Sequence, residues 1–222
     1  MFKTTTISFL KSLQKNNNKI WFDANRSNYL NAKLDYENFI ANLIKQTALF
    51  DNEIKDLQVK DCTYRVNRDI RFSKDKTPYK TNMGASLNRG GKKSVFAGYY
   101  FHLQPGGKSF TGGGLWMPMA PDLKKVRQEI DYCLEEFTDI INHKNFIKHY
   151  GNLEATDDIK LSNLPRGYDK NNPAAEYLKL KSFLALKPLP DKELLDSSLE
   201  KNVTDSFKAL MPLIKFINRA LE

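Results

Sequence analysis

The sequence predicts an α+β fold in which a central antiparallel sheet of about four or more strands is flanked by N-terminal and C-terminal helices. Three stretches of different periodicity carry this prediction. Apolar residues recur at helical spacing over residues 1–60, alternate with polar residues over 61–120, and return to helical spacing over 121–222. No internal repeat or long linker divides the 222 residues, so we expect a single domain.

The N-terminal part predicts two helices. Phe9 and Leu10 lie at helical spacing with Leu13 in the segment 6–15, and the asparagine run 16–18 ends this helix. A longer helix follows, and its apolar face comprises Leu30, Leu34, Phe39, Ile40, Leu43 and Ile44. Residues 51–61 are expected to form a short connector with room for one strand.

The central part predicts four strands joined by turns rich in glycine and proline. Alternation begins at Thr63, with Tyr64, Val66, Ile70 and Phe72 on one side of the first strand; Arg68 interrupts the pattern. The other three strands are expected over residues 81–87, 95–103 and 109–117.

Helical spacing returns after Pro121. We expect a helix from Asp122 to residue 140 or 141 and a second one that begins at Pro173 and continues to Leu180. Asp191 is expected to cap a short helix. The apolar spacing over 207–221 predicts a final helix that is kinked or restarted at Pro212.

Positive charge is concentrated in one segment. Residues 60–93 hold ten basic and three acidic residues, a net charge of +7 out of +9 for the whole chain. Basic side chains gathered on strands and turns attract phosphate or carboxylate groups. The partners that this segment favours are a small anionic ligand or nucleic acid.

The sequence also indicates where in the cell the protein is expected. No apolar run approaches the roughly 20 residues of a membrane span, and the N-terminus lacks the apolar core of a secretory signal. The two cysteines, Cys62 and Cys133, stand outside any paired motif, which favours reduced thiols. We expect a cytoplasmic protein without a membrane partner; its cofactors and oligomeric state stay open.

One segment resembles a known signature. Residues 65–81, RVNRDIRFSKDKTPYKT, closely resemble that of an uncharacterised family, domain of unknown function 2461. Three further blocks resemble the same family: Trp21–Phe22, then Gly98–Leu103 with Gly112–Trp116 and Pro118, and finally Pro165–Asp169. The resemblance extends over nearly the whole chain. Because it implies no reaction, the function has to be argued from the residues.

The first candidate site is the polar face of the strand expected over 63–72. Arg65, Asn67, Asp69 and Arg71 alternate there, so two guanidinium groups could clamp an anion while Asp69 orients one of them. The alternative is a solvated face. Arg68 points to the apolar side in this register, which requires an acid, a group of carbonyls or an anionic ligand beside it.

The second candidate is the loop over residues 73–81. Lys74, Lys76 and Lys80 offer donors for phosphate oxygens, and Tyr79 offers a ring for stacking on a base or sugar. The spacing is not that of a P-loop. An ordinary hairpin loop with solvated lysines is the competing interpretation.

The third candidate lies beside the glycine run 112–114. Tyr100 and His102 alternate on one strand and therefore share a face, and Trp116 follows the run. His102 is a candidate acid or base, although a lone histidine on a strand is more often structural. The fourth candidate is Arg166, on a loop of proline and glycine, which either completes an anion site or pairs locally with Asp169.

Our leading interpretation is the binding of a small anionic, phosphate-bearing ligand at a cationic sheet face. Whether the protein is also an enzyme stays open; Asp69 and His102 are the candidate catalytic residues. No metal ligands are predicted. Nucleic-acid binding through the same surface is one alternative, and a structural or partner-binding role with internal charge pairing is another. The expected ligand-binding residues are Arg65, Asn67, Arg68, Arg71, Lys74, Lys76, Tyr79, Lys80, Tyr100, Trp116 and Arg166.

Overall fold

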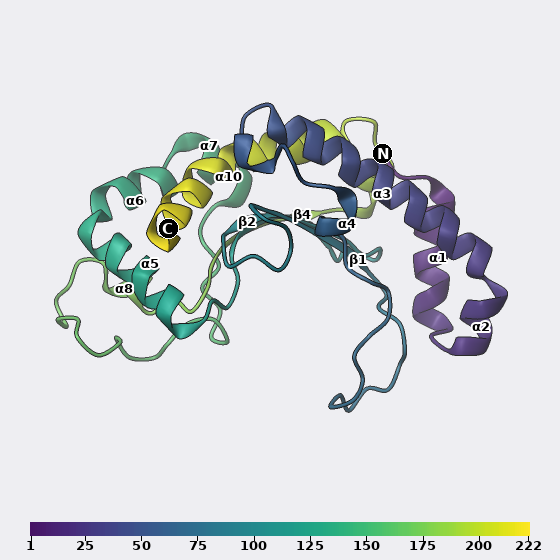
Figure 1. The fold of residues 1–222 in the computed structure, drawn as a ribbon, viewed down its shortest axis with the longest axis horizontal. Helices are drawn as coiled ribbons and strands as arrows, with labels where there is room; N and C mark the ends of the chain where they lie inside the picture. Colours follow the sequence, from purple (N-terminus) through teal and green to yellow (C-terminus); the bar gives the residue numbers. More distant parts are fainter.

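The computed structural model describes residues 1–222 and contains four strands and ten α-helices (Figure 1). The strands are β1 (Met83–Asn88), β2 (Gly98–Leu103), β3 (Ser109–Leu115) and β4 (Phe183–Leu189). The helices are α1 (Thr4–Lys15), α2 (Lys19–Ala24), α3 (Arg26–Ala48), α4 (Val59–Cys62), α5 (Ala120–Tyr132), α6 (Leu134–Ile141), α7 (Lys144–Tyr150), α8 (Ala175–Leu178), α9 (Asp191–Leu194) and α10 (Leu199–Leu221), and a 3-10 turn, η1, spans Asn52–Ile54.

The four strands form one antiparallel sheet in the order β1–β2–β3–β4. Tyr100 of β2 lies opposite Ser86 of β1 and Gly112 of β3, and Gly112 in turn lies opposite Leu186 of β4. The expected α+β fold, with this sheet between N-terminal and C-terminal helices, is confirmed.

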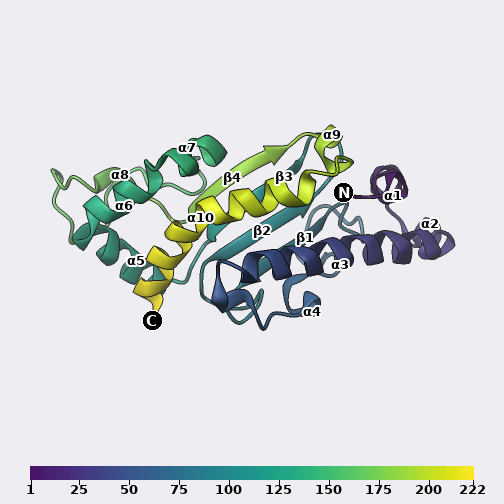
Figure 2. The same cartoon turned by 90° about the horizontal axis from the view of Figure 1, so that it is seen from above.

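Helices cover only one face of the sheet. Figure 2 shows α3 and α10 lying across that face, where Leu87, Tyr99 and Phe101 are fully buried. The side-chain amide of Asn218 on α10 accepts a hydrogen bond from the Ala97 amide (2.8 Å) and donates one to the Ala97 carbonyl (3.2 Å). This pair of bonds fixes α10 to the start of β2, and alternate strand residues form the core beneath the helices.

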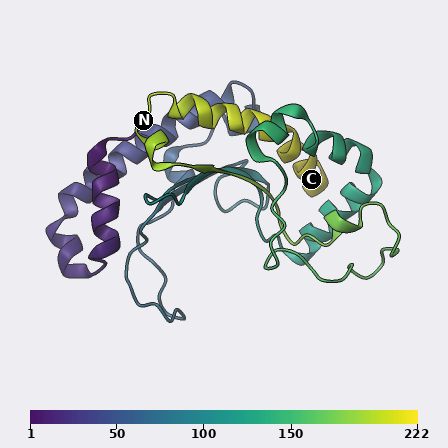
Figure 3. The same ribbon diagram turned by 180° about the vertical axis from the view of Figure 1, so that it is seen from behind.

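The other face of the sheet has no helical layer. Seen from behind, the molecule is an arch, with α1 and α2 at one end and α5, α6 and α8 at the other (Figure 3). The long loop between α4 and β1 hangs below the sheet on this open side (Figures 1 and 3). The open face is therefore flanked on several sides without being covered.

The prediction of a strand over residues 63–72 is wrong. Only two isolated bridges occur there, Thr63 with Ala85 and Asn67 with Tyr79. The segment forms the outgoing arm of the long loop. It pairs with the returning arm only briefly, through the Arg68 amide to the Pro78 carbonyl (2.9 Å) and the Lys80 amide to the Val66 carbonyl (2.8 Å). Beyond Arg68 the Asp69 carboxylate accepts from the Arg71 amide (3.3 Å), which turns the backbone away from a ladder. Phe72, expected on the apolar side, is 96% exposed.

The strand that completes the sheet is β4, in a region expected to be helical. Its sequence, FLALKPL, includes Pro188, which lacks a ladder donor and argues against a central strand. β4 lies at the edge of the sheet and pairs only with β3, so one side of its backbone needs no partner. An edge position therefore accommodates the proline.

Other boundaries differ in smaller ways. The helix expected from Asp122 to 140 or 141 is broken at Cys133 into α5 and α6. Residues 51–61 contain η1 and α4 and no strand, and α10 begins at Leu199 and continues through Pro212 without restarting. None of the helices combines the length and apolar character that crossing a membrane requires.

Candidate functional site

The open face of the sheet presents every second strand residue. Because pairing is antiparallel and in register, these residues form rows across the four strands. The rows are Gly84, His102, Phe110 and Pro188; Ser86, Tyr100, Gly112 and Leu186; and Asn88, Gly98, Gly114 and Leu184. On the two central strands, glycines therefore fill the third row, whereas Tyr100, His102 and Phe110 occupy the other two rows beside Gly112.

The glycine run 112–114 has a backbone conformation that other residues avoid. The three φ angles are 154°, 151° and 123°. A Cβ atom added at Gly113 would lie 2.1 Å from the Gly98 carbonyl oxygen, and one added at Gly114 would lie 1.9 Å from that of Phe183. Only glycine fits at these positions, so bare backbone forms the floor of the open face.

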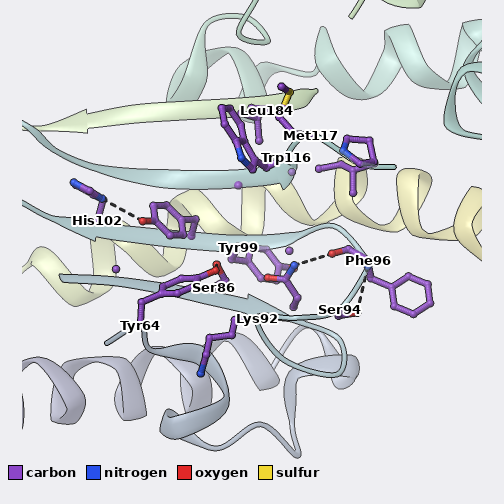
Figure 4. A pocket seen from close by; sticks show the side chains of 18 of the residues that line it. Tyr64, Ser86, Lys92, Ser94, Phe96, Tyr99, His102, Trp116, Met117 and Leu184 are labelled. Atoms are coloured by element: carbon purple, nitrogen blue, oxygen red, sulfur yellow. Dashed lines mark hydrogen bonds between the residues drawn. The ribbon is translucent and has the colours of Figure 1, made fainter. Parts of the chain in front are cut away.

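A groove of about 940 Å³ occupies this face. Figure 4 shows Trp116, Met117 and Leu184 on one side of it and Tyr64, Ser86 and Lys92 on the other. The sequence-predicted residues that line the groove are Arg65, Arg68, Asp69, Lys80, Tyr100, His102 and Trp116. The structure thus brings together residues from the first three candidate regions.

His102 forms part of an uncharged chain of hydrogen bonds. Its Nδ1 lies 3.2 Å from the Tyr100 hydroxyl, and its Nε2 lies 3.0 Å from the Gln104 side-chain oxygen. Burial lowers the pKa of His102 and raises the pKa of Tyr100 to about 12, so both are neutral near pH 7. Since Nε2 donates to Gln104, Nδ1 is free to accept from Tyr100. This arrangement adds no negative charge to the floor.

Three cations at the β1 side of the groove have no acidic partner, and one of them, Lys92, donates to the Lys60 carbonyl. Arg65 is exposed and Lys80 is half-buried, and neither side chain takes part in a salt bridge or hydrogen bond. Burial and the charge of Arg65 lower the pKa of Lys80. The Lys80 ammonium lies 5.5 Å from the ring centre of Tyr64, which is 42% exposed. Asp69 also lines the groove, and the charge of Arg65 contributes to the lowered pKa of this carboxylate, but its ion pair is with Arg71. Two like charges without an ion pair of their own in one groove favour an anion between them.

Arg68 is held within the loop. Its guanidinium group bonds to the Asp75 carboxylate and to the side chain and carbonyl of Thr77. Thr77 donates to Asp75 through its amide (2.9 Å) and its hydroxyl (3.0 Å). The backbone hydrogen bond to Thr77, followed by those of Arg68 and the Thr77 side chain, lowers the pKa of Asp75 to about 2. Arg68 was expected to require an acid, a group of carbonyls or an anionic ligand beside it, and in the structure its partner is an acid, Asp75.

Asp69 and Arg71 also pair with one another, through contacts of 3.0 and 2.7 Å. The hydrogen bonds from Arg71 lower the pKa of Asp69, which keeps this carboxylate ionised. Asp69 reaches the rim of the groove, whereas Arg71 does not. The first candidate face is therefore divided, with Arg65 in the groove and Asn67 and Arg71 exposed on the loop.

The remaining sequence-predicted residues lie outside the groove. Tyr79 is buried, and its ring stacks on Phe22 at a centroid distance of 3.9 Å, so it has no free face for a ligand. Lys74 is exposed on the loop, and Lys76 donates to the Ile70 carbonyl (3.0 Å). Arg166 is exposed on its own loop and does not line the groove. No three His, Cys, Asp or Glu side chains gather in a way that could hold a metal ion.

Several groove residues were not predicted from the sequence. Among them are Tyr64, Asn82, Ser86, Lys92 and Met117. Tyr64 was placed on an apolar strand side, but its hydroxyl lies 2.9 Å from that of Ser86 over the open face. The usable signal was the small residues Gly84 and Gly98, which share this face with Tyr100; an added Cβ at Gly84 would meet the Tyr100 hydroxyl at 2.5 Å.

Comparison with known proteins identifies one family. The family model described as "Conserved hypothetical protein (DUF2461)" matches residues 5–216. The match includes the sheet, the long loop and every segment that lines the groove. No curated protein and no solved structure matches the chain.

Proposed function

We propose that this chain, which belongs to the DUF2461 family of conserved hypothetical proteins, binds a small phosphate-bearing anion in the groove on its open sheet face. The observation that carries the proposal is the pair of unpartnered cations, Arg65 and Lys80, beside a neutral floor. An anion between them relieves their mutual repulsion, and each contact is a charge-assisted hydrogen bond.

Fewer residues of the basic segment are free to bind a ligand than the sequence indicates. Arg68 and Arg71 already bond to acids within the loop, and Arg89 pairs with Glu53 and Glu222. Internal pairing removes these side chains from ligand binding, in agreement with the structural alternative for that part of the segment. Arg65 and Lys80 are the two cations that both line the groove and remain unpaired.

The direct test is calorimetric titration of the full chain with inorganic phosphate and ribose 5-phosphate. The double variant Arg65→Ala/Lys80→Ala is expected to weaken binding by at least about 100-fold, since each of the two lost contacts to a charged group contributes about 1.5–3 kcal/mol. The matched control is Lys45→Ala/Lys208→Ala, which removes the same charge from exposed sites on the helices of the covered face. Equal losses in both double variants would contradict a specific site.

Nucleic-acid binding is the second candidate function. Trp116 is 63% exposed and Tyr64 is 42% exposed along the groove, and sheet surfaces that bind single strands use such rings for stacking. Both candidate functions use the same cations, but a small-anion site contacts one phosphate group and a strand-binding surface contacts several. A mononucleotide saturates a small site, whereas a strand-binding surface requires an oligomer and loses affinity steeply with salt.

A further inference from the structure

The groove is asymmetric across the sheet. Arg65 and Lys80 lie at its β1 side, near Tyr64, whose hydroxyl contacts Ser86 of β1. Trp116, Met117 and Leu184 lie at its β3–β4 side (Figure 4), as does Leu186 of β4. Trp116 and Met117 are 63% and 50% exposed. A phosphate ion held at the β1 side would leave this apolar side in water, so the two halves of the groove indicate a ligand with two chemically different ends.

The backbone after β3 holds Trp116 in place. Met117 is the only non-glycine residue with a positive φ, 41°, a sparsely populated conformation for a side-chain-bearing residue. Its amide donates to the Ser182 hydroxyl (2.9 Å), and Ser182 is fully buried just before β4. This anchored turn presents the indole ring at the rim instead of burying it in the core.

The separation of the two halves sets the size of the ligand. Trp116 follows β3, and Lys80 lies beside Tyr64, whose hydroxyl contacts Ser86 of β1. Neighbouring strands lie about 4.8 Å apart, so β1 and β3 are separated by about 10 Å across the sheet. Inorganic phosphate is too small to bridge that span. Between the halves lie the glycine floor and the neutral Tyr100 hydroxyl, which suit a flat polar linker better than a bulky one.

We propose that the ligand is a mononucleotide or a close analogue, with its phosphate at Arg65 and Lys80 and its planar ring stacked on Trp116. This inference rests on the proposed anion-binding function and specifies the substrate class of the same site. An exposed indole at the rim of an open groove provides a stacking platform for a planar ring. A flexible alkyl chain in the same place would remain exposed to water on one side.

The experiment compares inorganic phosphate, ribose 5-phosphate, adenosine and adenosine 5′-monophosphate by calorimetric titration of the full chain. The nucleotide is expected to bind about 10- to 100-fold more tightly than ribose 5-phosphate, because one base stacked on an aromatic ring contributes that factor. Trp116→Ala should abolish this difference without changing the affinity for ribose 5-phosphate. Tyr132→Ala, at a still more exposed ring (78%) outside the groove, is the control and should change neither affinity.

A spectroscopic measurement supplies a second readout. The chain has two tryptophans, so Trp21→Phe leaves Trp116 as the only indole. Stacking predicts that the nucleotide quenches this fluorescence with the same midpoint as the titration, whereas ribose 5-phosphate does not. Quenching that fails to saturate would overturn the stacking geometry.

The outcomes separate the two proposals. If ribose 5-phosphate and the nucleotide bind equally and Trp116→Ala has no effect, the inference about the ring is overturned while anion binding stands. If decyl phosphate binds more tightly than the nucleotide, an alkyl chain replaces the planar ring and the inference is likewise overturned. If none of the phosphates binds, the proposed function fails together with the inference.

Discussion

The half-buried amine of Lys80 gives the proposed site a measurable pH dependence. Burial and the nearby Arg65 lower its pKa from the ordinary value of 10.5, so the ammonium loses its proton at a lower pH than a free lysine does. An anion needs the charged form. Tyr100 in the same groove stays neutral in this range because its pKa is raised to about 12.

We therefore expect the affinity for ribose 5-phosphate to fall by about tenfold or more as the pH rises from 7 through the lowered pKa of Lys80. Lys80→Arg keeps its charge over this range and should bind the ligand with little pH dependence. Calorimetric titrations at several pH values measure both profiles. Parallel profiles in the two proteins would remove Lys80 from the site.

Arg127 on α5 gives a prediction about stability. Its side chain is 9% exposed, its only hydrogen bond goes to the Leu180 carbonyl (2.9 Å), and its buried Nε has no partner. Burial lowers the pKa of Arg127 because the charged form is poorly solvated. A buried charge without a counter-ion is destabilising.

Replacement of Arg127 by methionine, which retains a long apolar stem, is expected to raise the free energy of unfolding by about 1–2 kcal/mol. Urea denaturation followed by circular dichroism measures the change. Arg219→Met is the contrasting variant, since Arg219 bonds to both Glu129 and Glu136 and its loss should not stabilise the fold. A clear loss of stability in Arg127→Met would mean that an unseen group satisfies this guanidinium.

At the scale of single elements, β3 depends on its glycines. Gly113→Ala would place a Cβ atom 2.1 Å from the Gly98 carbonyl oxygen on β2. Relief of that contact requires the two strands to separate, so we expect a loss of about 3 kcal/mol or more in the free energy of unfolding. Gly107→Ala, at a turn glycine with a positive φ of 73° and no atom within 4 Å, is the matched control. Its loss should be near 1 kcal/mol, the ordinary conformational term, and equal losses would contradict a steric origin.

The loop between α4 and β1 is a second element whose order has an identified cause. Asp75 joins Arg68 to Thr77 and closes the loop tip. Asp75→Asn should loosen the tip while the sheet stays intact, because the contacts lie outside the core. Limited trypsin digestion is expected to cleave after Arg71, Lys74 or Lys76 severalfold faster in the variant, with an unchanged melting temperature. A large fall in melting temperature would show that the loop supports the whole fold.

The sequence predicted some elements well and others poorly, for physical reasons. Strands β1, β2 and β3 are short runs separated by turns rich in glycine and proline, so the turn signals between them made them predictable. The segment 63–72 alternates, but the Asp69 and Asp75 carboxylates accept from the Arg71 and Thr77 amides and so take backbone donors that a ladder would need. β4 was missed because Pro188 is compatible only with an edge strand, and edge position is a property of the assembled sheet.

The same distinction applies to the site. Arg65, Lys80, Tyr100, His102 and Trp116 were all named from the sequence, because charge and aromatic rings are visible in it. Their common groove was not, since it depends on which sheet face α3 and α10 cover. The adjacency of Arg65 and Lys80 arises from a backbone contact, the Lys80 amide to the Val66 carbonyl (2.8 Å), between segments fourteen residues apart.

At the scale of the whole molecule, the distribution of charge predicts how affinity responds to salt. Half of the ten basic residues in the segment 60–93 already bond to acids or to backbone carbonyls. The unpaired ones are Lys60, Arg65, Lys74, Lys80 and Lys93. Of these, only Arg65 and Lys80 line the groove.

A single-stranded oligonucleotide should therefore bind weakly and with a shallow salt dependence. The logarithm of affinity falls against the logarithm of salt concentration with a slope near −0.7 per phosphate contacted, so two contacts give a slope of about −1.4. If all five unpaired basic residues contact the strand, the slope approaches about −3.5. Fluorescence anisotropy with a labelled oligomer over a range of salt concentrations measures this slope. A slope of about −3.5 that becomes shallower in Lys60→Ala/Lys93→Ala would favour nucleic-acid binding as the function. Two cations in a groove cannot account for the release of that many counter-ions.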